Sequence, residues 1–101
     1  MIIVMGEITV EPGAADKVRD ALAEMEAETH KEAGCITYAF STDVVNPGTV
    51  RISERWNSME DIEAHTKTPH MAKFMESMAV LAPTAIEIKA FEVAQEVKLP
   101  L

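Results

Sequence analysis

The chain has 101 residues, of which 48% are hydrophobic and 26% are charged, a composition that suits one globular domain spanning residues 1–101. The net charge of −8 argues against a nucleic-acid partner, because phosphate binding needs clustered lysine and arginine. The single cysteine excludes an intrachain disulfide and a zinc site of paired cysteines. The apolar start MIIVM is too short for a signal peptide or a membrane span, so we expect a cytoplasmic protein with no membrane partner.

A strand and a helix are predicted at the start of the chain. Residues 2–10 are rich in β-branched side chains, which suits a strand buried on both faces. Residues 14–33 carry apolar side chains at helical spacing, and Gly34 stands where helices often end in a glycine. The inward positions of this helix are Val18, Leu22 and Met25.

Residues 35–56 predict an antiparallel β-hairpin, with strands over 35–42 and 50–56. Between them, Pro47-Gly48 fits the two central positions of a type II turn. Side chains of a strand alternate between its two faces. The side chains expected on one face of the first strand are Ile36, Tyr38 and Phe40. Those expected together on the second strand are Val50, Ile52, Glu54 and Trp56.

Two helices and a last strand follow the hairpin. Ser58 can cap the first helix, and Thr68 followed by Pro69 is typical of the start of the second. Pro83 ends the second helix, and residues 84–97 return to strand character. The apolar side chains that share one face of the second helix are Met71, Phe74, Met75 and Met78.

The predicted element order is β-α-β-β-α-β, which is the ferredoxin-like α+β arrangement. The two helices of such a fold cover one face of the sheet, whereas these strands carry apolar side chains on both faces. An apolar second face needs a partner, so we expect a homodimer packed sheet against sheet.

The segment 54–71, ERWNSMEDIEAHTKTPHM, carries the candidate chemistry. Trp56 is either a core residue or one wall of a cleft between sheet and helices. Glu54 shares its face and needs a partner. It forms either an ion pair, for instance with an arginine, which is the reading we favour, or part of a polar site. His65 follows Ile62 by three residues and therefore faces inward, as a structural group or as the best general base or acid in the chain.

The remaining candidates for reactive groups are less specific. His70 precedes Phe74 by four residues and borders either the same cavity or the surface, and His30 is expected on the surface. A Thr-Pro helix start separates His65 from His70, so the two do not share a helical face and we expect no bound metal. Cys35 has no sequence neighbour that would make a thiolate. The four scattered glycines contain no phosphate-binding motif.

The segment E-x-W followed by A-H and by T-P-H resembles the antibiotic biosynthesis monooxygenase domain family. The matching positions in this chain are Glu54, Trp56, Ala64-His65 and Thr68-Pro69-His70. Two further matches are the break at Pro12-Gly13 and the strand entry Gly34-Cys35-Ile36. The resemblance therefore covers nearly the whole chain.

This resemblance implies a dimeric α+β barrel. Family members include oxygenases that convert quinols or polycyclic phenols to quinones with O2 and without a metal or organic cofactor. Others degrade haem, and some act on a quorum-sensing signal molecule. The haem-degrading members use an asparagine on the first strand, whose place here falls near Gly6, and no asparagine occurs on this strand. The resemblance thus favours a quinol-monooxygenase-like enzyme without metal or flavin.

On this hypothesis a phenolic or enolic substrate lies between sheet and helices, and His65 removes its acidic proton. Tyr38 or Arg51 could hydrogen-bond the resulting oxyanion, and strand parity leaves open which of them reaches the site. The predicted catalytic residues are His65 and Trp56, and the predicted substrate-binding residues are Phe74, Met71, His70, Tyr38 and Glu54. Two alternatives are a non-catalytic dimer that binds a small molecule and an isomerase that uses the same His65.

Overall fold

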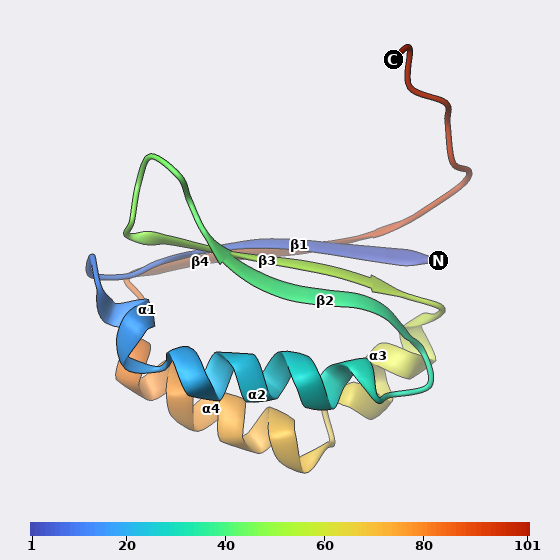
Figure 1. Ribbon diagram of the computed structural model, residues 1–101. Helices are drawn as coiled ribbons and strands as arrows, with labels where there is room; N and C mark the ends of the chain where they lie inside the picture. The colour runs from blue at the N-terminus through green and yellow to red at the C-terminus, as the bar shows by residue number, and fades with distance from the viewer.

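A four-stranded antiparallel sheet in the order β2-β3-β1-β4 forms one layer of the computed structural model, which describes residues 1–101. The strands are β1 (Ile2–Thr9), β2 (Cys35–Thr42), β3 (Thr49–Trp56) and β4 (Ala85–Glu92). The helices are α1 (Ala14–Lys17), α2 (Arg19–His30), α3 (Met59–His65) and α4 (Pro69–Leu81). All the helices lie on one side of the sheet (Figure 1). This confirms the predicted ferredoxin-like α+β arrangement.

The central strand β1 is buried on one face only. It pairs with β3, where Ile2 lies opposite Trp56, and with β4 on its other side. Its even-numbered side chains point toward the helices and are buried, whereas Met5 on the opposite face is 60% exposed. The prediction of a strand buried on both faces is therefore wrong for a single chain, because all the helices pack on the same side.

The core consists of two clusters between the sheet and the helices. One cluster joins the start of α2 to the end of α4, and its buried members are Ile8, Val10, Ala14, Val18, Leu22, Val50, Ile52 and Leu81. The other lies at the opposite end of the sheet, and its buried members are Ile2, Val4, Met25, Tyr38 and Trp56. The three inward positions predicted for the first helix are all buried as expected.

The first helical segment differs from its prediction at both ends. The backbone leaves helical geometry at Val18, with φ −119°, so α1 and α2 replace one continuous helix. At the far end α2 stops at His30, and Gly34 has no positive φ. Gly34 is therefore not a left-handed helix cap. A Cβ at this position would overlap the carboxyl group of Asp61, so the close approach of α3 explains the glycine.

The hairpin forms as predicted, but its turn and its first strand differ in detail. The backbone N–H of Thr49 donates to the carbonyl of Asn46 across Pro47-Gly48. Gly48 has no positive φ, so the turn is not type II. In β2 the pairing register shifts between Cys35 and Thr37, which makes Ile36 the extra residue of a β-bulge and leaves it exposed. Ile36 thus does not share the inner face with Tyr38 and Phe40.

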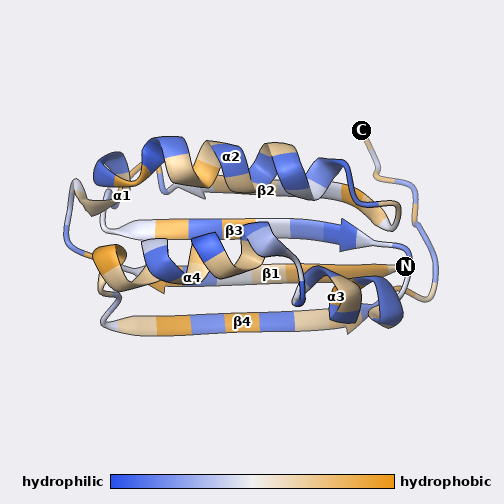
Figure 2. Ribbon diagram, turned by 90° about the horizontal axis from the view of Figure 1, so that it is seen from below, coloured by the Kyte–Doolittle hydropathy of each residue, from blue (hydrophilic) through white to orange (hydrophobic).

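The last strand is an edge strand that the helices leave largely uncovered. Figure 2 shows β4 lying beyond α4, with no helix over most of its length. Its helix-facing side chains Ile86 and Ile88 are consequently about half exposed. Ile88 lies over Gly6 of β1. A Cβ added at Gly6 would come within 2.8 Å of the Ile88 side chain. Strand pairing ends at Glu92, earlier than predicted, and the final residues extend away from the sheet (Figure 1).

The two later helices begin as predicted. The Ser58 side chain accepts a hydrogen bond from the N–H of Asp61, and Thr68 caps α4 in front of Pro69. Of the four apolar side chains predicted on one face of α4, Met75 is exposed and the other three are partly buried. No helix in the structure combines the length and the apolar character needed to span a membrane.

Candidate functional site

Trp56 and His65 come together where β3 ends and α3 runs back beneath the sheet. Both are buried, and their ring centroids lie 4.8 Å apart. Tyr38 of β2 also lies close to His65, with ring centroids 5.4 Å apart. The inward orientation predicted for His65 is therefore confirmed. The structure assembles this aromatic group from three elements that are separate in sequence.

Glu32 is a member of the site that sequence reasoning missed. Its Oε2 lies 2.6 Å from Nδ1 of His65 and 2.8 Å from Nε2 of His70. Glu32 follows the acidic helix α2 and has the local pattern of a solvated surface residue. Only the return of α3 and α4 beneath the end of α2 brings the two imidazoles to it. A lone glutamate just beyond a helix end gave no signal that could have found this contact.

The contact with Glu32 sets the orientation of the His65 imidazole. A carboxylate oxygen only accepts hydrogen bonds, so the Nδ1 atom of His65 carries a proton and donates it to Glu32. In the neutral ring this leaves Nε2 with a free lone pair. In hydrolase triads, too, a carboxylate holds one ring nitrogen of a histidine while the other ring nitrogen accepts the proton. His65 is thereby prepared to accept a proton at Nε2.

Glu54 pairs with the indole of Trp56 rather than with an arginine. The Nε1–H of Trp56 donates to Oε1 of Glu54 at 2.8 Å. No ion pair forms at Glu54, so the favoured expectation of an arginine partner is wrong. Burial raises the pKa of the Glu54 carboxyl, while the indole hydrogen bond and the nearby His65 oppose that shift. The partner of Glu54 is therefore the indole of Trp56.

Of the two candidate donors, Tyr38 lies beside His65 and Arg51 does not. Tyr38 faces the helices and is buried, and burial together with the charge of Glu54 raises the pKa of its phenol. It therefore remains a hydroxyl that can donate a hydrogen bond. Arg51 lies on the opposite face of the sheet, where it pairs with Glu7 and Asp43. It cannot act as a donor at the site.

The remaining predicted contacts pack at the edge of the same cluster. Met71 and Phe74 are half-buried on α4 and pack against it, and Phe74 stacks on Phe40 with centroids 5.5 Å apart. His30 is exposed as predicted, and its Nε2 also accepts the backbone N–H of Tyr38 at 3.2 Å. Burial raises the pKa of the Cys35 thiol, which agrees with its expected lack of nucleophilicity.

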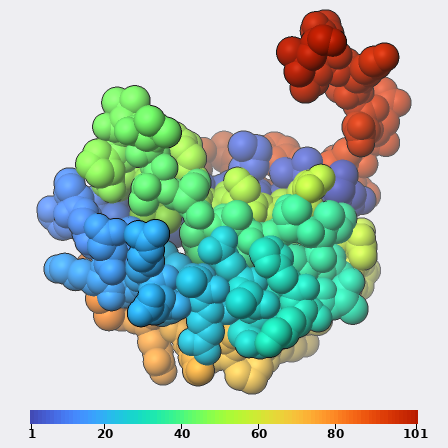
Figure 3. All heavy atoms as spheres, viewed as in Figure 1, coloured from blue at the N-terminus to red at the C-terminus, as the bar shows by residue number.

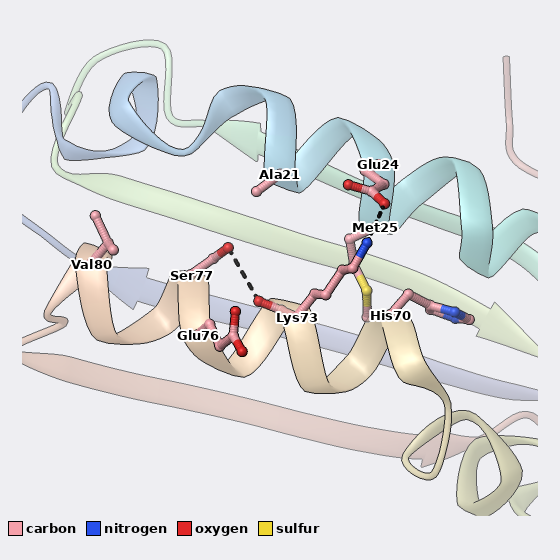
Figure 4. Close-up of a pocket in the computed structure, with 8 residues that line it drawn as sticks. All are labelled: Ala21, Glu24, Met25, His70, Lys73, Glu76, Ser77 and Val80. Atoms are coloured by element: carbon pink, nitrogen blue, oxygen red, sulfur yellow. Dashed lines mark hydrogen bonds and ion pairs between the residues drawn. The ribbon is translucent and has the colours of Figure 1, made fainter.

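Surface hollows lie beside the aromatic group rather than within it. A groove of about 350 Å³ between α2 and α4 has Met25 in its wall and His70 at one end (Figure 4). A second hollow lies between α2 and β2, and a third on the outer face of the sheet. Trp56 and His65 line none of these three. His70 is thus the residue that links the buried group to the α2–α4 groove.

Comparisons with known proteins match this chain to a family of monooxygenases. Residues 1–77 match the family model described as antibiotic biosynthesis monooxygenase. The chain is 32% identical over 88 residues to the "Probable quinol monooxygenase YgiN" of Escherichia coli K12, covering 77% of this chain and 85% of that protein. The same figures hold for the protein of that name from Shigella flexneri.

Solved structures share the whole architecture. A "putative antibiotic biosynthesis monooxygenase" from Deinococcus radiodurans superposes with a TM-score of 0.87 at 25% identity, covering 98% of both chains. A conserved protein from Methanosarcina mazei Go1 gives a TM-score of 0.81 at 22% identity, covering 89% of both chains. The likeness to the Methanosarcina mazei protein shows a shared fold alone.

Proposed function

This chain belongs to the antibiotic biosynthesis monooxygenase family, and from that membership we propose that it oxidises a small phenolic or quinol-type substrate with O2, without a metal or flavin. The observation that carries the proposal is the Glu32–His65 pair beside Trp56. A carboxylate that holds Nδ1 leaves Nε2 of His65 as a base, and the indole supplies a flat apolar wall. The name of the quinol monooxygenase relative supports the substrate class.

In this proposal, His65 Nε2 takes the phenolic proton and the resonance-stabilised anion gives one electron to O2. The carbon radical and superoxide then combine, which forms a C–O bond, and the imidazolium returns its proton to the peroxide. Loss of the hydrogen on that carbon and cleavage of the O–O bond leave a carbonyl group and release water. One oxygen atom of O2 ends in the quinone and the other in water. The protein supplies deprotonation, orientation and a dry wall.

The substrate would enter from the α4 side of the aromatic group. Trp56 and His65 are closely packed, whereas Met71 and Phe74 are only half-buried at the edge. Methionine side chains adapt readily to irregular apolar ligands. We propose that these two side chains move aside for the ring, that Tyr38 donates to the oxyanion, and that Glu54 and His70 line the polar rim.

Oxygen uptake by chelator-treated protein with a panel of hydroquinones and naphthols tests this function. We expect uptake that falls by roughly a hundredfold or more in His65→Ala, since positioned proton transfer typically contributes that much. His30→Gln is the matched control, because His30 is exposed outside the site and glutamine keeps an acceptor for the backbone N–H of Tyr38, so this variant should retain activity. Thermal stabilisation by a substrate without any turnover would instead support a binding protein, and product formation without oxygen use would support an isomerase.

We further propose that the protein is a homodimer joined through the outer sheet faces. Met5 and Phe91 expose apolar surface there, although the same face also carries the charged pair of Glu87 and Lys89. Figure 3 shows the loop around residues 43–48 and the final residues rising at opposite ends of this side. We propose that these two projections flank the partner sheet in the dimer.

A further inference from the structure

The three side chains around Glu32 offer a set of donor atoms that suits a metal ion. Oε2 of Glu32, Nδ1 of His65 and Nε2 of His70 all lie within 4.8 Å of one another. Two imidazoles and one carboxylate form a ligand set that suits divalent first-row transition metals. We propose that this Glu32–His65–His70 cluster binds one divalent ion such as Zn²⁺, and that the bound ion silences His65 as a base.

The distances in the cluster require all three side chains to adjust. The present separations of 2.6 and 2.8 Å are those of hydrogen bonds. Metal–ligand bonds of about 2.0–2.2 Å in a tetrahedral site place neighbouring donors roughly 3.3 Å apart. The carboxylate must therefore withdraw by about half an ångström, which the flexible side chain of Glu32 allows because it lies in the turn after α2. The two imidazole nitrogens, which lie within 4.8 Å of one another, must close to the same spacing of roughly 3.3 Å by rotation of their side chains.

The backbone that carries the two imidazoles is already held in place by the turn between α3 and α4. Oγ1 of Thr68 donates to the carbonyl of His65 at 2.8 Å and accepts the N–H of Met71 at 3.3 Å. This fixes the end of one histidine-bearing helix against the start of the other. Ligands supplied by such a fixed turn lose little conformational freedom when they bind an ion.

The cluster is shielded from water but can be reached. The side chains of His65, His70 and Glu32 are 4%, 13% and 16% exposed. His70 opens onto the α2–α4 groove, whose wall also carries Glu76 and the ion pair of Glu24 with Lys73 (Figure 4). An ion would enter along this groove, and a water molecule on that side would complete four-fold coordination.

Binding would change the proton on His65. Nδ1 carries a proton while it donates to Glu32, and a metal needs the lone pair of that nitrogen. The proton must therefore move to Nε2, which is the atom proposed to accept the substrate proton. An ion at the cluster and base catalysis by His65 thus exclude each other.

Calorimetric titration of chelator-treated protein with Zn²⁺ tests the site without any substrate. We expect one ion per chain with a dissociation constant of about 10 μM or tighter, weakened at least tenfold in Glu32→Gln and in His70→Asn. His30→Asn removes a histidine outside the cluster and should bind as the unchanged protein does. Co²⁺ should give the visible absorption bands of a tetrahedral site in the same variants that bind Zn²⁺.

Binding weaker than about 100 μM, or equal affinity in all the variants, would overturn the site. Circular dichroism and thermal melts show whether each variant folds, and Glu32→Gln keeps an oxygen acceptor for the histidines. The result is independent of the proposed oxidation, which is tested by oxygen uptake in metal-free protein. If that uptake is found, Zn²⁺ should abolish it in proportion to occupancy and a chelator should restore it. Stimulation by the ion would overturn the silencing of His65.

Discussion

At the scale of single residues, Glu54 shows how burial and hydrogen bonding compete. Its carboxylate accepts the indole N–H of Trp56, but burial is the larger effect and raises its pKa above the ordinary value of 4.5. A carboxyl whose folded-state pKa is raised holds its proton more tightly when folded than when unfolded. The folded state is therefore penalised as the pH rises through that raised pKa, and the penalty is absent below the ordinary value.

Replacing Glu54 by glutamine should reveal this penalty. Glutamine keeps an oxygen that accepts from Trp56 but does not ionise. We expect Glu54→Gln to gain stability relative to the unchanged protein as the pH rises from about 4 to about 7.5. Urea unfolding followed by the fluorescence of Trp56, the only tryptophan, measures the difference at both pH values. If the two proteins differed in stability by the same amount at both pH values, the raised pKa of Glu54 would be contradicted.

At the scale of elements, the α3–α4 turn connects helix capping to the site. Thr68 accepts the N–H of Met71 as the N-cap of α4 and also donates to the carbonyl of His65. The same hydroxyl therefore starts a helix and holds the end of the one before it. Its loss would loosen both histidines that contact Glu32.

The change Thr68→Ala should lower the free energy of unfolding by about 1 kcal/mol, the usual cost of removing an N-cap side chain. Thr68→Ser retains the hydroxyl and should restore most of that loss. Thr66→Ala is the neighbouring control, because Thr66 is exposed and only donates to the carbonyl of Glu63; its effect should stay within about 0.5 kcal/mol. Equal losses for Thr66→Ala and Thr68→Ala would show that the cap contributes nothing specific.

At the scale of the whole molecule, the one-sided placement of the helices controls what is exposed. Because α2 and α4 both pack beneath the sheet, its outer face keeps apolar side chains in contact with water. Hydrophobic burial would be regained if two chains packed these faces together. The proposed dimer therefore follows from the architecture rather than from any single motif.

The change Phe91→Glu should convert a dimer to a monomer, because it places a charge within the proposed interface. Phe91 is 52% exposed on the outer face of β4. The matched control is Val80→Glu on α4, which is 58% exposed but belongs to the helix layer. Light scattering after size-exclusion chromatography measures the mass of each. A monomeric starting protein, or a Phe91→Glu variant that stays dimeric, would contradict the proposed interface.

Much of the fold and part of the site could be read from the sequence, because their signals are local. Strand alternation placed Trp56 and Glu54 on one face, helical spacing turned His65 inward, and the Thr68-Pro69 start matches the observed cap. These patterns depend on neighbours a few residues apart. They survive in any tertiary arrangement that buries the same faces.

Tertiary structure alone decided the features that depend on contacts between distant segments. Glu32 meets His65 across 33 residues of sequence, and nothing in the local pattern of either residue records that contact. Gly34 likewise avoids a clash with Asp61, although by position it resembles a helix cap. The sequence by itself thus determined the order of the strands and helices and the inward faces of α2 and β3. The packing of α3 and α4 beneath the end of α2 decided which polar groups meet, because it brings together side chains whose sequence separation carries no periodic signal.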